Sequence, residues 1–230
     1  MAAAPGGMKG FYTFLGVAAV IGIGIIGFLL RRKPSISIPA NPVIQVADTS
    51  GFRGYMLGSD SAALEVSEYA DFQCPACQQW ATVQFPSIEE RLIRSGKVRW
   101  RYRDFPLDMH PFSRIAAHVA ACASEQGKYW EMNQKIYTWD GDWPEKSNPI
   151  GVFNDYANAV GLDRTKYDAC MNTGRYAGRM RASYLEGVAA GVTSTPTFLI
   201  NGRLYPGGGA VNHDMLKALL DSLAGQKTAK

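Results

Sequence analysis

The sequence predicts a mixed α/β domain with a long helical insertion, preceded by one N-terminal transmembrane helix. Three observations lead to this fold class. They are an uncharged apolar run near the N-terminus, a strand that leads into a Cys-x-x-Cys motif, and a hairpin signal that follows a long helical stretch. A helix between the first two strands indicates a parallel crossover, whereas a hairpin is antiparallel, so the sheet should be mixed.

The apolar run covers residues 11–30 and contains no charged side chain. At about 1.5 Å per residue, it is long enough to cross a hydrocarbon core of about 30 Å. A cleaved signal peptide is the alternative, but the run exceeds the usual apolar length of about 7 to 15 residues and no A-x-A cleavage site follows it. We therefore predict a membrane anchor at 11–30, after an N-terminal tail at 1–10.

A linker rich in proline and glycine is predicted at 31–60, followed by the folded domain at 61–225 and a C-terminal tail at 226–230. The linker begins with Arg31, Arg32 and Lys33, which by the positive-inside rule favour a cytoplasmic domain. These three residues and Lys9 account for the net charge of +4, since the rest of the chain has equal numbers of acidic and basic residues. A nucleic-acid partner is therefore not expected.

The domain should start with a strand at 64–69, where polar and apolar residues alternate. A helix follows from Pro75 toward Gly96 and is interrupted at Pro86. In the next strand, at 98–103, three arginines alternate with apolar residues, and we interpret the arginine face as solvated.

The later elements are read from helical periodicity and turn residues. The stretch between Pro106 and Gly191 is mostly helical, and Asn201-Gly202 is typical of a hairpin turn. The expected helices are 151–160, 164–171, 176–189 and 213–223, and the hairpin strands are 197–200 and 203–205.

Cys74 and Cys77 stand at the junction between the first strand and its helix. The helix N-terminus stabilises a thiolate, so Cys74 is the predicted nucleophile and Cys77 the resolving thiol, which should be the less exposed of the two. Half of a zinc site is the alternative, but Cys122 and Cys170 are too far apart in sequence to supply a second close pair.

Three segments resemble the DsbA-like branch of the thioredoxin superfamily over roughly residues 61–223. They are Glu68–Cys77, Arg103–Leu107 and Thr195–Gly202. The resemblance implies a thioredoxin-like fold with a helical domain inserted at about 107–191. It departs from the best-known pattern at Ala76, where a histidine would stabilise the thiolate, so strong oxidising power is not implied.

The resemblance also implies roles for residues outside the cysteine motif. Pro196 should be cis and face the two cysteines, with Thr195 beside it. Glu68 should be a buried acid that exchanges a proton with Cys77, and the alternative is an exposed strand glutamate. Asp71 is interpreted as a turn residue.

Cys122 and Cys170 both lie on apolar helical stripes, so they are either two buried free thiols or a structural disulfide. The even number of cysteines and an exported location favour the disulfide. His110, His118 and His213 show no metal-ligand spacing and receive no catalytic role.

The predicted function is that of a membrane-anchored, extracytoplasmic thiol-disulfide oxidoreductase, periplasmic or at the cell surface. It would form or exchange disulfides in exported polypeptides, need no cofactor, and be recycled by a separate membrane redox partner. The alternatives are an exported reductase or isomerase and a non-catalytic metal-binding module.

Overall fold

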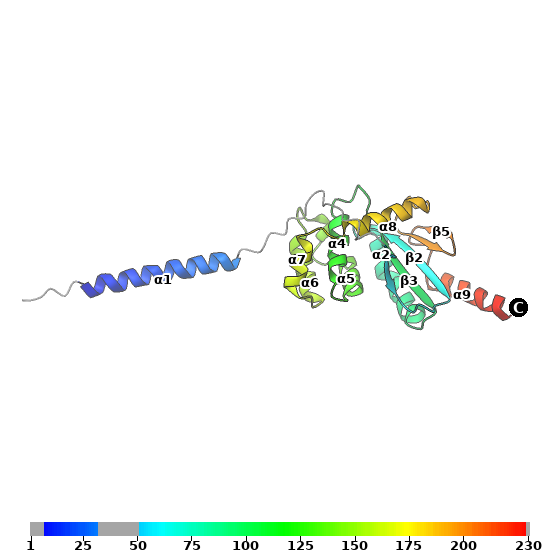
Figure 1. Ribbon diagram of the computed structural model, residues 1–230, viewed down its shortest axis with the longest axis horizontal. Coiled ribbons are helices and arrows are strands. Elements are labelled where there is room, and N and C mark those ends of the chain that lie inside the picture. Colours follow the sequence, from blue (N-terminus) through cyan, green and yellow to red (C-terminus); the bar gives the residue numbers. More distant parts are fainter. Residues whose placement is uncertain (1–6, 32–50, 229–230) are drawn as a thin grey trace, which may run out of the picture. The chain divides into compact units, whose positions relative to one another are not determined.

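The computed structural model describes residues 7–31 and 51–228 (Figure 1). The predicted N-terminal tail at 1–10, the linker at 31–60 and the C-terminal tail at 226–230 each lie partly outside these residues. The chain divides into two units, one that contains helix α1 (Gly7–Arg31) and one that contains every later element.

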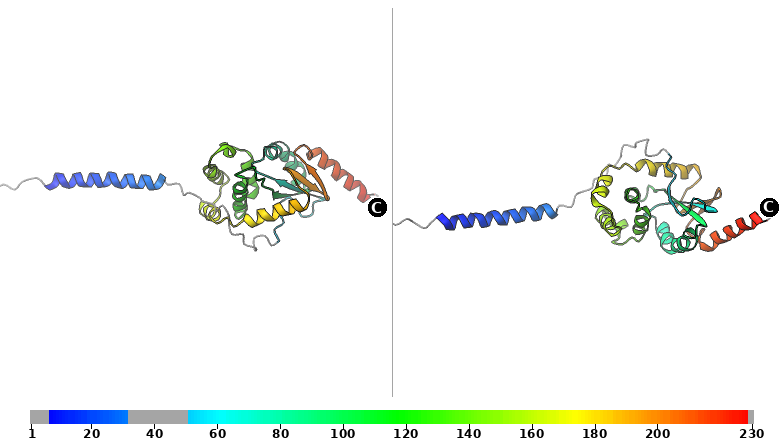
Figure 2. Two further views of the ribbon diagram at one scale, coloured as in Figure 1. Left: turned by 90° about the horizontal axis from the view of Figure 1, so that it is seen from above. Right: turned by 60° about the horizontal axis from the view of Figure 1, so that its bottom comes forward.

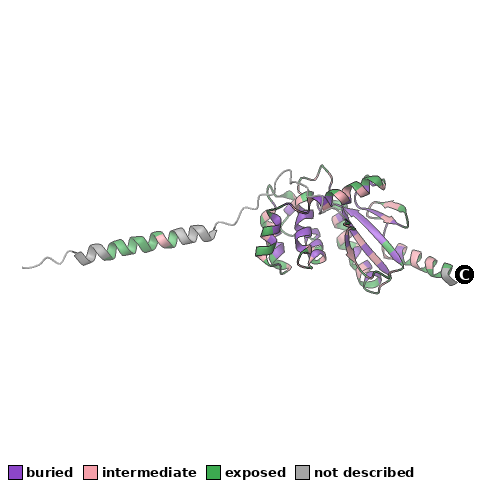
Figure 3. Cartoon of the chain, in the orientation of Figure 1, coloured by how far each residue is buried: buried purple, intermediate pink, exposed green. Residues whose placement is uncertain are grey.

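Helix α1 includes the whole apolar run from residue 11 to 30. Its side chains are described from Tyr12 to Gly24, and nearly all of these are exposed (Figure 3). Within the described residues, no helix reaches the combined length and hydropathy of a membrane span. The predicted transmembrane helix is therefore not shown by the structure.

The second unit is built on a five-stranded sheet with the strand order β1-β3-β2-β4-β5. β2 and β3 are parallel, and the other three pairings are antiparallel, so the mixed sheet is confirmed. The strands are β1 (Tyr55–Leu57), β2 (Leu64–Ala70), β3 (Val98–Asp104), β4 (Thr197–Ile200) and β5 (Arg203–Pro206).

Strand β1 lies within the segment predicted as a linker at 31–60, so the last part of that prediction is wrong. β1 pairs with the edge of β3, with Tyr55 opposite Tyr102. Three residues are too few to show an alternating pattern, and the strand is defined by its partner rather than by its own sequence.

The helices after α1 lie in the stretches predicted to be helical. They are α2 (Pro75–Val83), α3 (Phe85–Ile88), the π-helix η2 (Glu89–Ile93), α4 (Ser113–Ser124), α5 (Tyr129–Tyr137), the 3-10 helix η3 (Trp143–Glu145), α6 (Ile150–Ala159), α7 (Arg164–Met171), α8 (Ala177–Ala189) and α9 (His213–Thr228). However, α9 runs on to Thr228, past the predicted end at 223 and into the predicted tail at 226–230. The break between α2 and α3 falls beside Pro86, as expected. Helices α4 to α8 form the predicted insertion, and α4 to α7 gather to one side of the sheet (Figure 1).

The main hydrophobic core lies between one face of the sheet and helices α2, α3 and α9. Trp80 of α2 stacks on Trp100 of β3, with ring centroids 5.4 Å apart. A smaller cluster of Tyr69, Phe105 and Val192 covers the opposite face, where α8 lies along the sheet (Figure 2). The central strands β2 and β3 are thus covered on both faces, as expected for parallel strands.

The interpretation of the arginine face of β3 as solvated is wrong. Glu186 on α8 accepts hydrogen bonds from Arg101, at 2.7 Å, and from Arg103, whose side chain is 1% exposed. The neighbouring Gly187 permits this close packing, because a Cβ there would lie 2.8 Å from the ring of Phe105. The alternation on β3 is therefore one between an apolar face and an ion-paired face.

Candidate functional site

The cysteine motif lies where β2 ends and α2 begins. Cys74 is the residue before the helix and Pro75 is its first residue, a position that does not need a backbone N–H. Cys74 is 6% exposed, and Cys77, inside the first turn, is fully buried. Both cysteines are free thiols in this structure, and Cys77 is the less exposed of the two, as predicted.

The two sulfur atoms have opposite electrostatic environments. A hydrogen bond from the Cys77 thiol is the largest influence on Cys74 and, against the effect of burial, lowers its pKa to about 5. The side chain of Thr195 and the backbone N–H groups at the start of α2 contribute in the same direction. Burial raises the pKa of Cys77 well above its ordinary value, and the hydrogen bond to Cys74 raises it further. At neutral pH, Cys74 is therefore the thiolate and Cys77 the thiol.

Thr195 and Pro196 lie beside this pair, although they are far from it in sequence. The Thr195-Pro196 peptide bond is cis. The Thr195 carbonyl oxygen is 3.5 Å from Cys74 Sγ, at a hydrogen-bonding distance for the protonated thiol. Because β4 starts at Thr197 and pairs with β2, the sheet itself brings this segment to the N-terminus of α2.

Glu68 is buried, with 3% of its surface exposed, so the alternative of an exposed strand residue is excluded. Trp100 donates a hydrogen bond from Nε1 to Glu68 Oε2 at 2.8 Å, whereas Oε1 has no partner among the described residues. Burial raises the pKa of Glu68 to about 8, and the hydrogen bond from Trp100 opposes this rise. Glu68 is therefore mostly protonated at neutral pH.

The sequence predicted only a turn role for Asp71, but its carboxylate makes several further contacts. Its Oδ1 accepts a hydrogen bond from the backbone N–H of Gln73 at 2.8 Å, which is the predicted turn, and another from the Ser113 hydroxyl. Its Oδ2 accepts the N–H of Leu107 at 2.9 Å and lies 2.7 Å from Nδ1 of His110. One buried carboxylate thus fastens the start of the helical insertion to the cysteine motif.

A pair of tyrosines was also missed. The hydroxyl groups of Tyr102 on β3 and Tyr137 on α5 are 2.8 Å apart and buried. Burial raises the pKa of Tyr137 well above its ordinary value, and Cys77 and Glu68 raise it further. Tyrosines in apolar stripes look like ordinary core residues in the sequence, and no local signal marks this pair.

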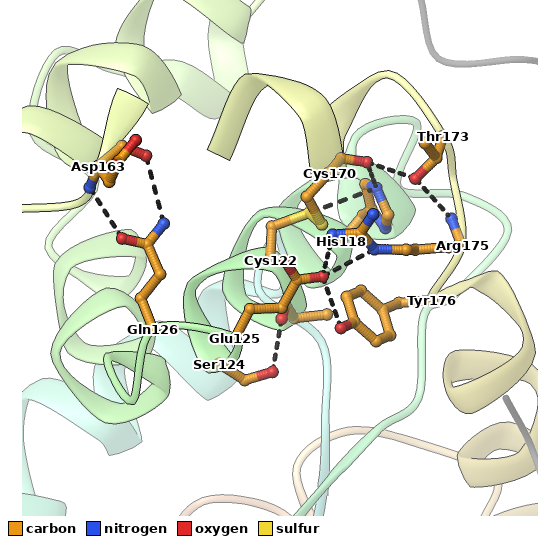
Figure 4. Close-up of a disulfide and its surroundings, with 11 residues drawn as sticks. His118, Cys122, Ser124, Glu125, Gln126, Asp163, Cys170, Thr173, Arg175 and Tyr176 are labelled. Carbon is orange, nitrogen blue, oxygen red and sulfur yellow. Dashed lines mark hydrogen bonds and ion pairs between the residues drawn. A yellow bond between two sulfur atoms is a disulfide. The ribbon is translucent and has the colours of Figure 1, made fainter. Parts of the chain in front are cut away.

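Cys122 of α4 and Cys170 of α7 form a disulfide in this structure (Figure 4). His118 lies next to it, with Nε2 3.5 Å from Cys122 Sγ and 3.3 Å from the Cys170 carbonyl oxygen. Within the described residues, these three form the one cluster with the spacing of metal ligands, but its two sulfur atoms are bonded to each other. The cluster is separate from Cys74 and Cys77.

The chain matches the family described as Thioredoxin over residues 52–222. It is similar to a Na(+)/H(+) antiporter, NhaA 3, of Salinispora tropica, with 33% identity over 156 residues, which are 67% of this chain and 22% of that protein. It is also similar to a Na(+)/H(+) antiporter, NhaA 1, of Salinispora arenicola, with 31% identity over 171 residues, which are 74% of this chain and 24% of that protein. The chain therefore spans about a quarter of the length of these relatives.

Several solved structures share the fold. They include Wolbachia pipientis alpha-DsbA1, with a TM-score of 0.63 and 22% identity over 76% of this chain and 92% of that one. BdbD from Bacillus subtilis has a TM-score of 0.64 and 18% identity over 80% of this chain and 98% of that one. Chlamydia trachomatis DsbA has a TM-score of 0.66 and 16% identity over 81% of this chain and 98% of that one. The chain belongs to the thioredoxin family, and its fold is that of the DsbA-like branch of the thioredoxin superfamily.

Proposed function

We propose that this protein is a membrane-tethered thiol-disulfide oxidoreductase that forms or exchanges disulfides in exported polypeptides through Cys74 and Cys77. The observation that carries the proposal is the asymmetry of the two sulfurs, since the pKa of Cys74 is lowered to about 5 and that of the buried Cys77 is raised. Such a pair at a helix N-terminus suits thiol-disulfide exchange, in which one thiolate attacks or leaves and a second thiol resolves the intermediate.

In the oxidising direction, the enzyme starts with a Cys74–Cys77 disulfide. A substrate thiolate attacks Cys74 Sγ, a mixed disulfide forms, and Cys77 leaves as a thiolate that takes up one proton. A second substrate thiolate then attacks the substrate sulfur of the mixed disulfide, which releases Cys74 as a thiolate and the substrate as a disulfide. The low pKa of Cys74 favours this second step, because a more acidic thiol leaves faster.

Three residues around the cysteines have supporting roles in this proposal. The backbone of Thr195, next to Cys74, pairs with an extended substrate strand, and Pro196 helps to shape the same surface. Glu68, protonated at neutral pH, supplies the proton that Cys77 takes up. A separate membrane redox partner then removes two electrons from the dithiol and restores the disulfide.

The membrane tether in this proposal is helix α1, which would cross the bilayer with residues 11–30. This run is uncharged, and Phe14, Val20 and Ile23 expose 73%, 71% and 71% of their surface. The similarity to proteins named as antiporters adds support for a membrane setting. Antiporter activity is not proposed, because the chain spans only about a quarter of their length.

We propose further that the domain lies outside the cytoplasm, in the periplasm or at the cell surface. The Cys122–Cys170 disulfide supports this location, since disulfides persist in oxidising compartments. Arg31, Arg32 and Lys33 favour the opposite orientation. A reporter fused after Lys230 that is active only in the cytoplasm should be inactive, and strong activity would overturn the topology.

The enzymatic proposal is tested with the purified full-length protein and a reduced, unfolded disulfide protein as substrate. Disulfide formation should be faster with the oxidised enzyme, and Cys74→Ala should abolish the effect. Equilibration with glutathione gives the redox potential, which separates an oxidase from a reductase or isomerase. A wild-type protein that exchanges no disulfides with either thiols or disulfides would refute the proposal.

A further inference from the structure

Glu68 and the tyrosine pair belong to one row of side chains across the sheet. Glu68 on β2 and Tyr102 on β3 are register partners, so their side chains project from the same face as direct neighbours. The hydrogen bond between Trp100 and Glu68 fixes the carboxyl on that face. The hydroxyl of Tyr137 then lies 2.8 Å from that of Tyr102. Glu68 is thus the neighbour of Tyr102 on the sheet, and Tyr102 is hydrogen-bonded to Tyr137 on α5, whereas Oε1 of Glu68 has no hydrogen-bond partner among the described residues.

Tyr137, the last residue of this row, is also one of the residues that line a cavity. Tyr137 and Asn133 of α5 line a cavity of about 390 Å³ between α5 and the segment from α2 to η2. Two other lining residues, Glu90 and Arg94, have side chains that are 70% and 66% exposed, so the cavity communicates with solvent. The buried Nδ2 of Asn133 has no hydrogen-bond partner among the described residues, which makes the inner part of the cavity suitable for water.

We propose that Tyr137 and Tyr102 form the proton path between this cavity and Glu68, and thereby control how fast Cys77 gains or loses its proton. The inference rests on the proposed function and deepens it by naming the residues of the path. Glu68 needs such a path because it is buried. The free oxygen of its carboxyl, Oε1, has no partner among the described residues, so one position for proton exchange is open.

One proton is transferred in each half-reaction. When Cys77 leaves the disulfide as a thiolate, it takes the proton of the Glu68 carboxyl. The Glu68 carboxylate regains a proton in one concerted shift. A water molecule at its free Oε1 gives it a proton and takes one from the Tyr102 hydroxyl, which at the same time takes one from Tyr137, and Tyr137 takes one from water in the cavity. The net change is one proton moved from water to Cys77 and one hydroxide left in solvent, and reoxidation reverses each transfer.

The surroundings of the two tyrosines keep them neutral. Tyr137 is faced by Cys77 of α2, Glu68 of β2, Tyr102 of β3 and Asp71 of the loop after β2. Tyr102 is faced by the same glutamate and by Asp104 of its own strand. Burial and these acidic groups raise the pKa of both hydroxyls, so they pass protons on through their hydrogen bond without becoming phenolates.

The test is a single-turnover measurement on the full-length oxidised protein. A dithiol peptide reduces the enzyme, and the release of Cys77 is followed over a range of pH in H₂O and D₂O. Tyr137→Phe removes the hydroxyl and keeps the ring. We expect it to slow the reaction near neutral pH by about tenfold, below the usual range for lost general acid–base catalysis because water can partly substitute. The solvent isotope effect should change as well.

Two further variants separate the path from a structural effect. Tyr167→Phe is the matched control, because Tyr167 is also fully buried, its hydroxyl has no partner among the described residues, and it lies on α7, outside the row. It should leave the rate unchanged. Tyr102→Phe should slow the reaction as Tyr137→Phe does, and it provides the test if the first variant folds poorly.

A double-variant cycle identifies Glu68 as the end of the path. In the Glu68→Gln background, Tyr137→Phe should cost no additional rate, because the path then has no acceptor. An unchanged rate and isotope effect in both Tyr→Phe variants, or equal losses with and without Glu68, would overturn the path. A wild-type enzyme without any exchange activity would instead overturn the proposed function.

Discussion

The indole of Trp100 donates a hydrogen bond of 2.8 Å to Oε2 of Glu68 inside the core of the domain. This contact stabilises the carboxylate, but burial has the larger effect and raises the pKa of Glu68 to about 8. Glu68 is therefore an acid that folding makes harder to ionise, with consequences for both stability and turnover.

The pH dependence of stability should reveal this acid. Because the pKa of Glu68 is about 8 in the folded protein and near 4.5 when unfolded, the folded state binds more protons between these values. The stabilisation of the folded state that comes from Glu68 is fully present below pH 4.5 and is lost as pH rises through about 8. Urea unfolding of Glu68→Gln should show a flatter decline over this window than the parent protein.

The comparison is best made without Cys74, because its lowered pKa adds stability as pH rises and would partly mask the decline that Glu68 causes in the parent protein. The matched pair is therefore Cys74→Ala and Cys74→Ala/Glu68→Gln. Asp104, also buried with its pKa raised to about 7, is present in both proteins and contributes equally. Identical pH slopes in the two proteins would contradict the assignment.

The acidity of Cys74 should depend on Cys77. The Cys77 thiol is the largest influence that lowers the pKa of Cys74 to about 5, so Cys77→Ala should move the midpoint of alkylation to higher pH. The same variant should trap mixed disulfides through Cys74, whereas Cys74→Ala should trap none. Thiolate absorbance and alkylation rates measure both effects, and equal alkylation of the two thiols in the reduced wild type would count against the assigned roles.

The disulfide should act on stability and leave the cysteine chemistry intact. Cys122 and Cys170 are 48 residues apart, and chain entropy for a loop of that size predicts a loss of about 4 kcal/mol in unfolding free energy when both become alanine. The alkylation midpoint of Cys74 should stay where it is, because the disulfide joins α4 to α7. A double variant with wild-type stability would show that the bond is dispensable.

Local sequence patterns correctly predicted those helices, strands and turns whose structure depends on neighbouring residues. The strand at 64–69 and the helix at 164–171 agree with β2 and α7, and the Asn201-Gly202 turn connects β4 and β5. In each, periodicity or turn chemistry within a few residues sets the structure. The position of the cysteine motif could be predicted for the same reason, because the strand, the two cysteines and the start of the helix follow one another in one short segment.

Features that depend on a distant partner were missed. β1 is a strand because β3 pairs with it, and Arg101 and Arg103 of β3 are ion-paired because α8 places Glu186 over them. The hydrogen bond between the hydroxyl groups of Tyr102 and Tyr137 joins a strand residue to a helix residue 35 positions further along the chain. Alternation reports which residues share a face, and it does not report what covers that face.

Asp71 provides the clearest test of such a distant contact. Its carboxylate accepts backbone hydrogen bonds from Gln73 and Leu107 and contacts His110 and Ser113, so it links the cysteine motif to the start of the helical insertion. Asp71→Ala leaves these buried donors without an acceptor, which should cost about 3 kcal/mol or more of unfolding free energy. Asp71→Asn should cost less, because its amide oxygen can still accept one of the backbone hydrogen bonds.

The matched control is Asp108→Ala in the same loop. The Asp108 side chain is 90% exposed and is paired with Arg114, so its removal should change unfolding free energy by less than about 1 kcal/mol. Chemical unfolding gives both free energies, and alkylation of Cys74 reports whether the motif keeps its geometry. Because Gln73 precedes Cys74 directly, we expect Asp71→Ala to change the alkylation rate and Asp108→Ala to leave it unaltered. Equal stabilities of the two variants would mean that the Asp71 contacts do not hold the insertion to the cysteine motif.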